Sequence, residues 1–265
     1  MNNKQRNTLK ILQLSDCHVS ADPETGYRGQ NADRNLRALI PEMKAWNPDR
    51  VLLSGDISED ASPESYRRIA HALSSLAVPL LALPGNHDSP SEMKRHFPLG
   101  PWQGPFAHRA GSWLLVMLDS TGPGEISGSI APQELETLDK LFRADPAEHI
   151  LLALHHQPVP VNAPWIDKYA LQDSEPLLEL LDRTDRLRCV TWGHIHQDFQ
   201  TTREGVLMLG APSSVANSLP RTPVFTLDPA GPACRWLDLG SDGTVKTGVL
   251  RPGQSSTGRT SQRIR

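Results

Sequence analysis

The sequence predicts an α/β fold in which short apolar strands alternate with helices. The first observation is a series of short apolar runs, each followed directly by polar residues. The second is that several of the intervening segments carry apolar side chains at helical spacing, an arrangement typical of βαβ units. The third is a change after Gln197, where short runs separated by Gly, Pro and Asp predict antiparallel strands that finish a second sheet.

Five apolar runs end in side chains that can carry chemistry. Residues 9–14 precede Asp16 and His18, 50–53 precede Gly55 and Asp56, 78–83 precede Asn86, His87 and Asp88, 150–154 precede His155 and His156, and 188–192 precede His194 and His196. In open α/β sheets, ligands bind outside the carboxyl ends of the strands. We therefore expect these five ends to converge on one rim.

The other elements follow from periodicity and from proline positions. Residues 32–46 predict a helix that Pro41 should kink or divide, and Pro63 suits the first position of a second helix. Further helices are expected at 91–96, 132–143 and 175–181, and another strand at 113–118. The last strands are expected at 206–209, 224–227, 234–239 and 244–250.

Length and composition favour one domain over residues 1–251, followed by a disordered tail at 252–265 that is rich in Ser, Thr, Gly and Arg. With 265 residues, 38% hydrophobic residues and a net charge of −3, the chain has the composition of a globular protein without a broad basic surface for nucleic acid. Neither a leader nor a membrane span is expected. Cys17, Cys189 and Cys234 indicate no disulfide framework, so a cytoplasmic location fits best. The protein is expected to be a monomer or a homodimer.

The side chains at the predicted rim are oxygen and nitrogen ligands that first-row divalent metals accept without thiolates. Two such ions about 3.5–4 Å apart can share a water, lower its pKa and present hydroxide to a phosphorus atom. Asp56 is the natural bridge because it follows a glycine turn in the middle of the series. We expect Asp16, His18 and His196 to complete one metal site, and Asn86, His155 and His194 to complete the other.

Two assignments are less direct. His87 follows the expected ligand Asn86 and suits a general acid that protonates the leaving oxygen, although it could instead donate a hydrogen bond to the phosphate. Asp88, Glu59 or Asp60 could orient it. Of the adjacent pair, His155 is preferred to His156 as the ligand, because successive side chains along an extended chain point to opposite sides.

The ordered set of motifs resembles the calcineurin-like metallophosphoesterases over residues 9–215. The matching positions are Asp16-x-His18, Gly55-Asp56, Gly85-Asn86-His87-Asp88, His155 and Gly193-His194-x-His196. The resemblance implies a four-layer αββα sandwich, with two mixed β-sheets flanked by helices. It also implies a dinuclear metal site that hydrolyses a phosphoester.

Within that superfamily the chain looks most like the bacterial class III 3',5'-cyclic AMP phosphodiesterases, the CpdA or Icc group. The stretches 154–160, 165–167, 193–197 and 211–214 carry this likeness, together with Asn31. It implies hydrolysis of 3',5'-cyclic AMP to 5'-AMP by a metal-bridging hydroxide, with two ions that are Fe or Mn, or else Zn or Co. The implied catalytic residues are Asp56, Asn86 and His87, and the implied substrate-binding residues are His18, Asn86, His87 and His196.

The chain departs from that group at two positions. The group often has Gln where this chain has Asn217, and Thr where it has Cys17. If the Asn217 loop lies over the base, the nucleotide preference is open. The rival hypotheses are therefore a metallophosphoesterase for another diester (a 2',3'-cyclic nucleotide, a glycerophosphodiester or a nucleoside diphosphate derivative), or a non-catalytic scaffold that keeps the fold.

Overall fold

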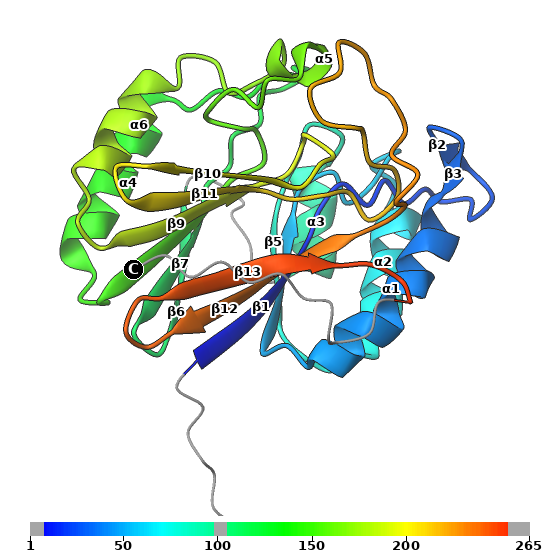
Figure 1. The fold of residues 1–265 in the computed structure, drawn as a ribbon, viewed down its shortest axis with the longest axis horizontal. Coiled ribbons are helices and arrows are strands. Elements are labelled where there is room, and N and C mark those ends of the chain that lie inside the picture. The colour runs from blue at the N-terminus through cyan, green and yellow to red at the C-terminus, as the bar shows by residue number, and fades with distance from the viewer. Residues whose placement is uncertain (1–7, 98–104, 254–265) are drawn as a thin grey trace, which may run out of the picture.

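The computed structural model describes residues 8–97 and 105–253, and it has the four-layer arrangement that the sequence resemblance implies (Figure 1). Two mixed sheets face each other, and helices cover their outer surfaces. Residues 254–265, which form most of the expected tail, lie outside the described residues. Among the helices that are described, none is long and apolar enough to cross a membrane.

The first sheet contains the first three predicted strands. Its order is β13-β12-β1-β4-β5, with bounds Val245–Leu250, Cys234–Gly240, Thr8–Leu14, Arg50–Ser54 and Leu80–Leu83. β1, β4 and β5 run parallel, whereas β12 and β13 are antiparallel to their neighbours. The parallel strands place their carboxyl ends at one edge, which is where the site loops begin.

The second sheet contains the remaining two strands that precede polar clusters. Its order is β10-β11-β9-β8-β7-β6, with bounds Phe199–Arg203, Val206–Gly210, Leu187–Trp192, His149–Ala153, Trp113–Met117 and Phe106–Ala110. The four central strands are parallel, and the two edge strands pair antiparallel. β6 and β10 were not expected from the sequence, because neither has a continuous apolar run.

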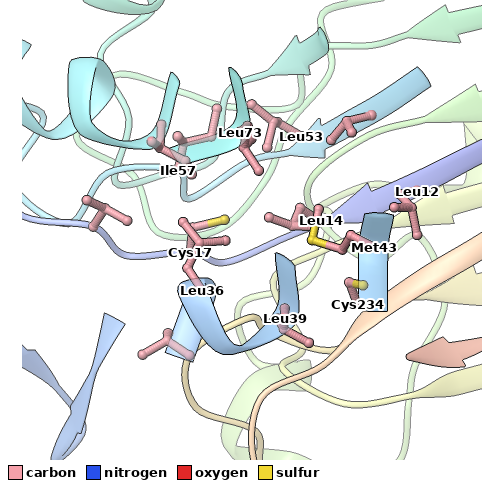
Figure 2. Close-up of a cluster of buried hydrophobic side chains, with 14 of the residues drawn as sticks. Leu12, Leu14, Cys17, Leu36, Leu39, Met43, Leu53, Ile57, Leu73 and Cys234 are labelled. Carbon is pink, nitrogen blue, oxygen red and sulfur yellow. The ribbon is translucent and has the colours of Figure 1, made fainter. Parts of the chain in front are cut away.

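Two helical layers enclose the sheets. α1 (Ala32–Trp46), α2 (Pro63–Ser74) and α3 (Pro90–His96) cover the first sheet, and Figure 2 shows the buried side chains that join α1 and α2 to its strands. α4 (Pro132–Ala144) and α6 (Glu175–Asp182) pack on the second sheet, while α5 (Pro164–Asp167) lies in the loop after β8. A third cluster, which includes Leu52, Leu115 and Leu209, fills the space between the sheets.

Local chemistry explains the helix ends. The Asn31 side chain accepts a hydrogen bond from the Arg34 backbone, and the Ser62 side chain caps α2 before Pro63 in the same way. The expected division of α1 at Pro41 is wrong: the helix is continuous from Ala32 to Trp46. Pro41 lies on the exposed face, where solvent can satisfy the carbonyl that loses its backbone partner.

Two loop expectations also differ from the structure. Residues 224–227 form no strand; they belong to the loop between β11 and β12, which closes on itself through one antiparallel bridge between Ser218 and Leu227. The region after His18 contains a short hairpin, β2 (Gly26–Tyr27) and β3 (Gln30–Asn31). A two-residue turn closes it, and both turn residues, Arg28 and Gly29, have positive φ.

Candidate metal centre

The loops that follow β1, β4, β5, β8 and β9 meet at one edge of the two sheets. Backbone hydrogen bonds join them directly: Asp16 N donates to Gly55 O at 3.0 Å, and Gly193 N donates to His155 O at 3.1 Å. The bond between Gly193 and His155 connects two loops of the second sheet. A third bond, from Ser214 N to Ser15 O at 3.1 Å, connects the two sheets. Strand ends from both sheets therefore build one rim, as the sequence predicts.

Five of the seven expected metal ligands have left-handed backbone conformations. They are Asp16, His18, Asp56, His194 and His196, with φ values of 50°, 43°, 48°, 66° and 51°. This region is uncommon for residues with a Cβ and costs on the order of 1 kcal/mol or more each. The strained conformations occur at the ends of the strands, where they turn the side chains away from the strand direction and into the rim.

Asp16, His18 and His196 form the first cluster of possible ligand atoms. His196 Nε2 lies 3.2 Å from Asp16 Oδ1, and His18 Nε2 lies 3.3 Å from His196 Nε2. The other ring nitrogen of His196 donates to the Ala216 carbonyl at 2.7 Å. That bond fixes the tautomer, so the Nε2 lone pair faces the cluster.

Asp56 lies between this cluster and a second one. Its Oδ2 is 3.7 Å from His18 Nε2, and its Oδ1 is 3.5 Å from His155 Nε2. His155 donates its Nδ1 proton to the Ser54 carbonyl at 2.8 Å, and its ring lies 5.1 Å from that of His194, centroid to centroid. One carboxylate therefore presents one oxygen to each cluster, as a bridging ligand requires.

The donor set fits divalent metals, and buried atoms without partners support this. Asn86 Oδ1, His155 Nε2 and His194 Nε2 are buried and have no hydrogen-bond partner among the described residues. Polar atoms in such positions are costly unless they are satisfied. All three belong to the residues expected to hold the second ion, and all three can act as ligands to first-row metals.

The ionisation states of the clustered side chains are also compatible with metal binding. Burial lowers the pKa of His18 and lowers that of His194 well below its usual value, so both imidazoles are neutral and keep a lone pair. Burial opposes the ionisation of Asp56, but the charge of His155 outweighs it and holds the Asp56 pKa well below the usual value. Burial opposes the ionisation of His155 as well, but the Asp56 carboxylate outweighs it and raises the pKa of His155 to about 9. The centre thus combines charged carboxylates with neutral imidazoles at His18 and His194, and a metal ion on His155 would take the place of its proton.

His87 stands at the open side of the centre, with its side chain 34% exposed. Its Nδ1 lies 3.2 Å from Glu59 Oε2, and the same carboxylate oxygen lies 2.7 Å from His18 Nδ1. The hydrogen bond that His87 donates to Glu59 raises the pKa of His87 to about 9. Burial opposes the ionisation of Glu59, yet the hydrogen bonds from His18 and His87 hold its pKa at about 2.

We expected Asp88, Glu59 or Asp60 to orient His87. Of these three carboxylates, the structure places only Glu59 against it. Asp88 points into the fold: it accepts hydrogen bonds from the backbones of Ile57, Ser58 and Gly85 and from the Tyr66 hydroxyl. Asp60 accepts from Ala21 N and Ser62 N. No sequence spacing distinguishes the three, because the difference lies in how the loop after β4 folds back.

His155 and His156 point in different directions. His156 donates Nε2–H to the Ile126 carbonyl at 3.0 Å and accepts from the Ser120 hydroxyl at Nδ1, at 2.9 Å. Both of its nitrogens are used, and burial lowers its pKa to about 3. His155, by contrast, aims an unpartnered nitrogen at Asp56, so the geometry favours it as the ligand.

Two amides noted in the sequence, Asn217 and Asn31, make contacts that support the fold. Asn217 is buried; its Oδ1 accepts from Ser213 N, and its amide donates to the carbonyls of Ser213 and Gly231. The Asn31 side chain caps α1 and donates to the Pro23 carbonyl. The Tyr27 side chain lies closer to the clusters: its ring stacks on His18, 3.7 Å away between centroids.

Comparisons with known proteins agree with this geometry. Residues 9–198 match the calcineurin-like phosphoesterase family. The chain is 33% identical over 246 residues to the 3',5'-cyclic adenosine monophosphate phosphodiesterase CpdA of Pseudomonas aeruginosa, covering 92% of this chain and 90% of that protein. It is also 33% identical over 245 residues to a 3',5'-cyclic-nucleotide phosphodiesterase of Nostoc, covering 92% of both. A dimetal phosphatase from Danio rerio shares the fold, with a TM-score of 0.73, 14% identity, and coverage of 97% and 98%.

Proposed function

The chain belongs to the calcineurin-like phosphoesterase family and is a metal-dependent hydrolase, and we propose that it hydrolyses 3',5'-cyclic AMP to 5'-AMP. The observation that carries this proposal is the pair of ligand clusters that share Asp56. The names of the two relatives that are each 33% identical support the choice of a cyclic nucleotide as substrate.

We assign Asp16, His18, Asp56 and His196 to one ion and Asp56, Asn86, His155 and His194 to the other, with Mn or Fe as the ions. When bound, the two ions would supply a water of lowered pKa as nucleophile and positive charge to stabilise the phosphate oxygens. Asp56 presents one oxygen to each cluster and would be the ligand that both ions share. The carbonyls of Ser54 and Ala216 orient His155 and His196 for this role.

His87 is the proposed proton donor to the departing 3' oxygen. Its Nδ1 is held by Glu59, so its Nε2–H is free to face the substrate. Because Glu59 raises the pKa of His87 to about 9, the ring carries its proton near neutral pH, as an acid needs. Together with His18, His196 and Asn86, it lines the side of the centre where we place the phosphate.

The test is turnover of 3',5'-cyclic AMP by the purified protein loaded with Mn, with the product identified by chromatography. 2',3'-cyclic AMP and bis(p-nitrophenyl) phosphate are run beside it, and an Asp56→Ala variant serves as blank. We expect selective formation of 5'-AMP that the variant abolishes. Cleavage of the artificial diester alone would overturn the cyclic-nucleotide substrate but keep the hydrolase, and no cleavage by metal-loaded protein would favour a scaffold.

A further inference from the structure

Four side chains from three separate loops meet beside the metal centre. They are Tyr27 and Arg28 of the β2–β3 hairpin, Trp165 of α5, and Phe225 of the loop between β11 and β12. We call this set the Arg28 rim. In Figure 1 the orange loop that contains Phe225 arches between α5 and the β2–β3 hairpin. The guanidinium carbon of Arg28 lies 4.1 Å from the Phe225 ring centre, 5.4 Å from that of Tyr27 and 5.7 Å from that of Trp165.

The Arg28 rim adjoins the expected metal ligands. Tyr27 stacks on His18 with an angle of 6° between the rings, and its ring centre is 5.7 Å from that of His196. Trp165 and Phe225 pack edge to face, 5.3 Å apart, and their centres lie 6.4 and 6.3 Å from His196. This rim therefore lies within reach of a substituent on a substrate whose phosphate sits over the two clusters.

Packing of the loops alone does not account for these residues. Arg28 is exposed and forms no ion pair with a described residue; its Nε donates to the Tyr27 hydroxyl at 3.2 Å. The indole Nε1–H of Trp165 is buried without an acceptor among the described residues. The unsatisfied donor of Trp165 is explained by a ligand that supplies a hydrogen-bond acceptor, and the guanidinium of Arg28 is available to stack on a flat ligand.

Two amide side chains from the same segments, Asn31 and Asn217, are not available to read base edges. The amide groups of Asn31 and Asn217 are committed to capping α1 and to closing the 213–231 loop. What remains is planar surface: three aromatic rings and a guanidinium that lies over one of them. Such surfaces bind nucleobases by stacking, which requires a base but depends little on its edge.

Resting on the proposed function, we propose that the Arg28 rim is the specificity element of this enzyme. It selects diesters that carry a nucleobase, by stacking the base against the guanidinium of Arg28 and the rings of Trp165 and Phe225. The two ligand clusters bind the phosphate of any diester, so the preference for a nucleotide comes from this rim.

The test compares cyclic AMP with the 3',5'-cyclic phosphate of 1-deoxyribose, which has the same ring system but no base. We expect kcat/KM of the wild-type protein to be at least about tenfold higher for cyclic AMP. Arg28→Lys keeps the positive charge and loses the planar group, and Phe225→Ala removes the ring beneath it. Each should reduce the ratio of the two kcat/KM values by about tenfold, whereas Arg37→Ala, at an exposed arginine on α1, should leave it unchanged.

Equal turnover of both substrates by the wild type, or an equal loss on both in the variants, would overturn the rim as a base-selecting element. A binding measurement distinguishes a failure of the base-selecting rim from a failure of the proposed hydrolysis of cyclic AMP. By calorimetry, wild-type protein should bind AMP about tenfold more tightly than ribose 5-phosphate, and Arg28→Lys should remove the difference. If neither cyclic phosphate is hydrolysed but this binding preference is found, the proposed reaction fails and the rim stands; if the preference is absent, the rim fails.

Discussion

At the scale of single residues, one carboxylate contacts both a proposed metal ligand and the proposed proton donor. Glu59 Oε2 lies within hydrogen-bonding distance of His18 Nδ1 and His87 Nδ1 at once. Through His18 it fixes the tautomer that leaves Nε2 facing Asp56 and His196. Through His87 it keeps an imidazole protonated at the open side of the centre.

Replacing His87 by Ala should lower kcat for cyclic AMP by about 10²-fold or more, because the 3' oxygen is a basic leaving group that needs a proton. The loss should be far smaller for bis(p-nitrophenyl) phosphate, since p-nitrophenolate leaves without protonation. Metal content, measured by elemental analysis, should be nearly unchanged. Loss of metal in this variant would make His87 a ligand and contradict its assignment as the acid.

Glu59→Gln should affect both of its partners. We expect metal affinity to fall by about 10- to 100-fold, because a neutral amide holds the His18 imidazole less strongly than a carboxylate does. kcat at saturating metal should also fall, because the charge that keeps His87 protonated is lost. Competition with a chromophoric chelator measures the first effect. Glu64→Gln, at an exposed partner of Arg67, is the control, and equal metal affinities in the two variants would contradict the role of Glu59.

At the scale of elements, the site depends on turns in which no side chain fits. A Cβ at Gly85 would overlap the backbone nitrogen and Oδ1 of Asp56 and would lie 2.8 Å from His155 Cε1. A Cβ at Gly193 would overlap Ser15 Oγ and would lie 2.7 Å from the Ser54 carbonyl. These two glycines let the loops after β5 and β9 approach the loops of β1 and β4.

Gly85→Ala should therefore displace Asp56 or the loop that carries Asn86. We expect a loss of metal binding and of turnover by about 10²-fold or more, since displacements of about 1 Å at a catalytic centre have effects of this size. Circular dichroism should still show a folded α/β protein. Gly122→Ala is the matched control, because the nearest atoms to its added Cβ lie 3.6 Å away. Full metal occupancy in Gly85→Ala would contradict this prediction, because it would show that the loop can shift to accommodate the Cβ and still bind metal.

At the scale of the whole molecule, the residues that we assign to the two ions come from both sheets. Asp16, His18, Asp56 and Asn86 follow strands of the first sheet, whereas His155, His194 and His196 follow strands of the second. Between the sheets the contacts are mainly apolar, from side chains such as Ile11, Leu81 and Met117. Bound ions would add polar links between the two layers at one edge.

Metal loading should accordingly stabilise the folded protein. At a free Mn concentration of about 100 times Kd, one binding site adds about 2.7 kcal/mol to the free energy of unfolding, which corresponds to a rise in Tm of roughly 5–10 °C. Differential scanning calorimetry with and without a chelator measures this shift. Asp56→Asn, which changes the ligand shared by both clusters, should abolish most of it; an unchanged shift in that variant would contradict the bridging assignment.

Strand ends, helix caps and the order of polar motifs follow from the sequence because each depends on neighbouring residues. Apolar runs that finish in Asp16, Asp56 or His155 reveal both the buried strands and the edge where their ends meet. The parallel arrangement then brings together residues that are far apart in the chain, such as His18 and His196, 178 positions away. Periodicity reports burial, so weakly apolar edge strands such as β6 and β10 were missed.

Only the tertiary structure decided which polar side chains face the centre and which serve the fold. Glu59 and Asp88 are both carboxylates near the motifs, yet one contacts His18 and His87 while the other accepts hydrogen bonds from buried backbone. Arg28 and Phe225 meet because two long loops fold over the same edge. Hydrogen-bond and stacking partners depend on how separate loops pack, and the spacing of residues along one chain carries no record of that packing.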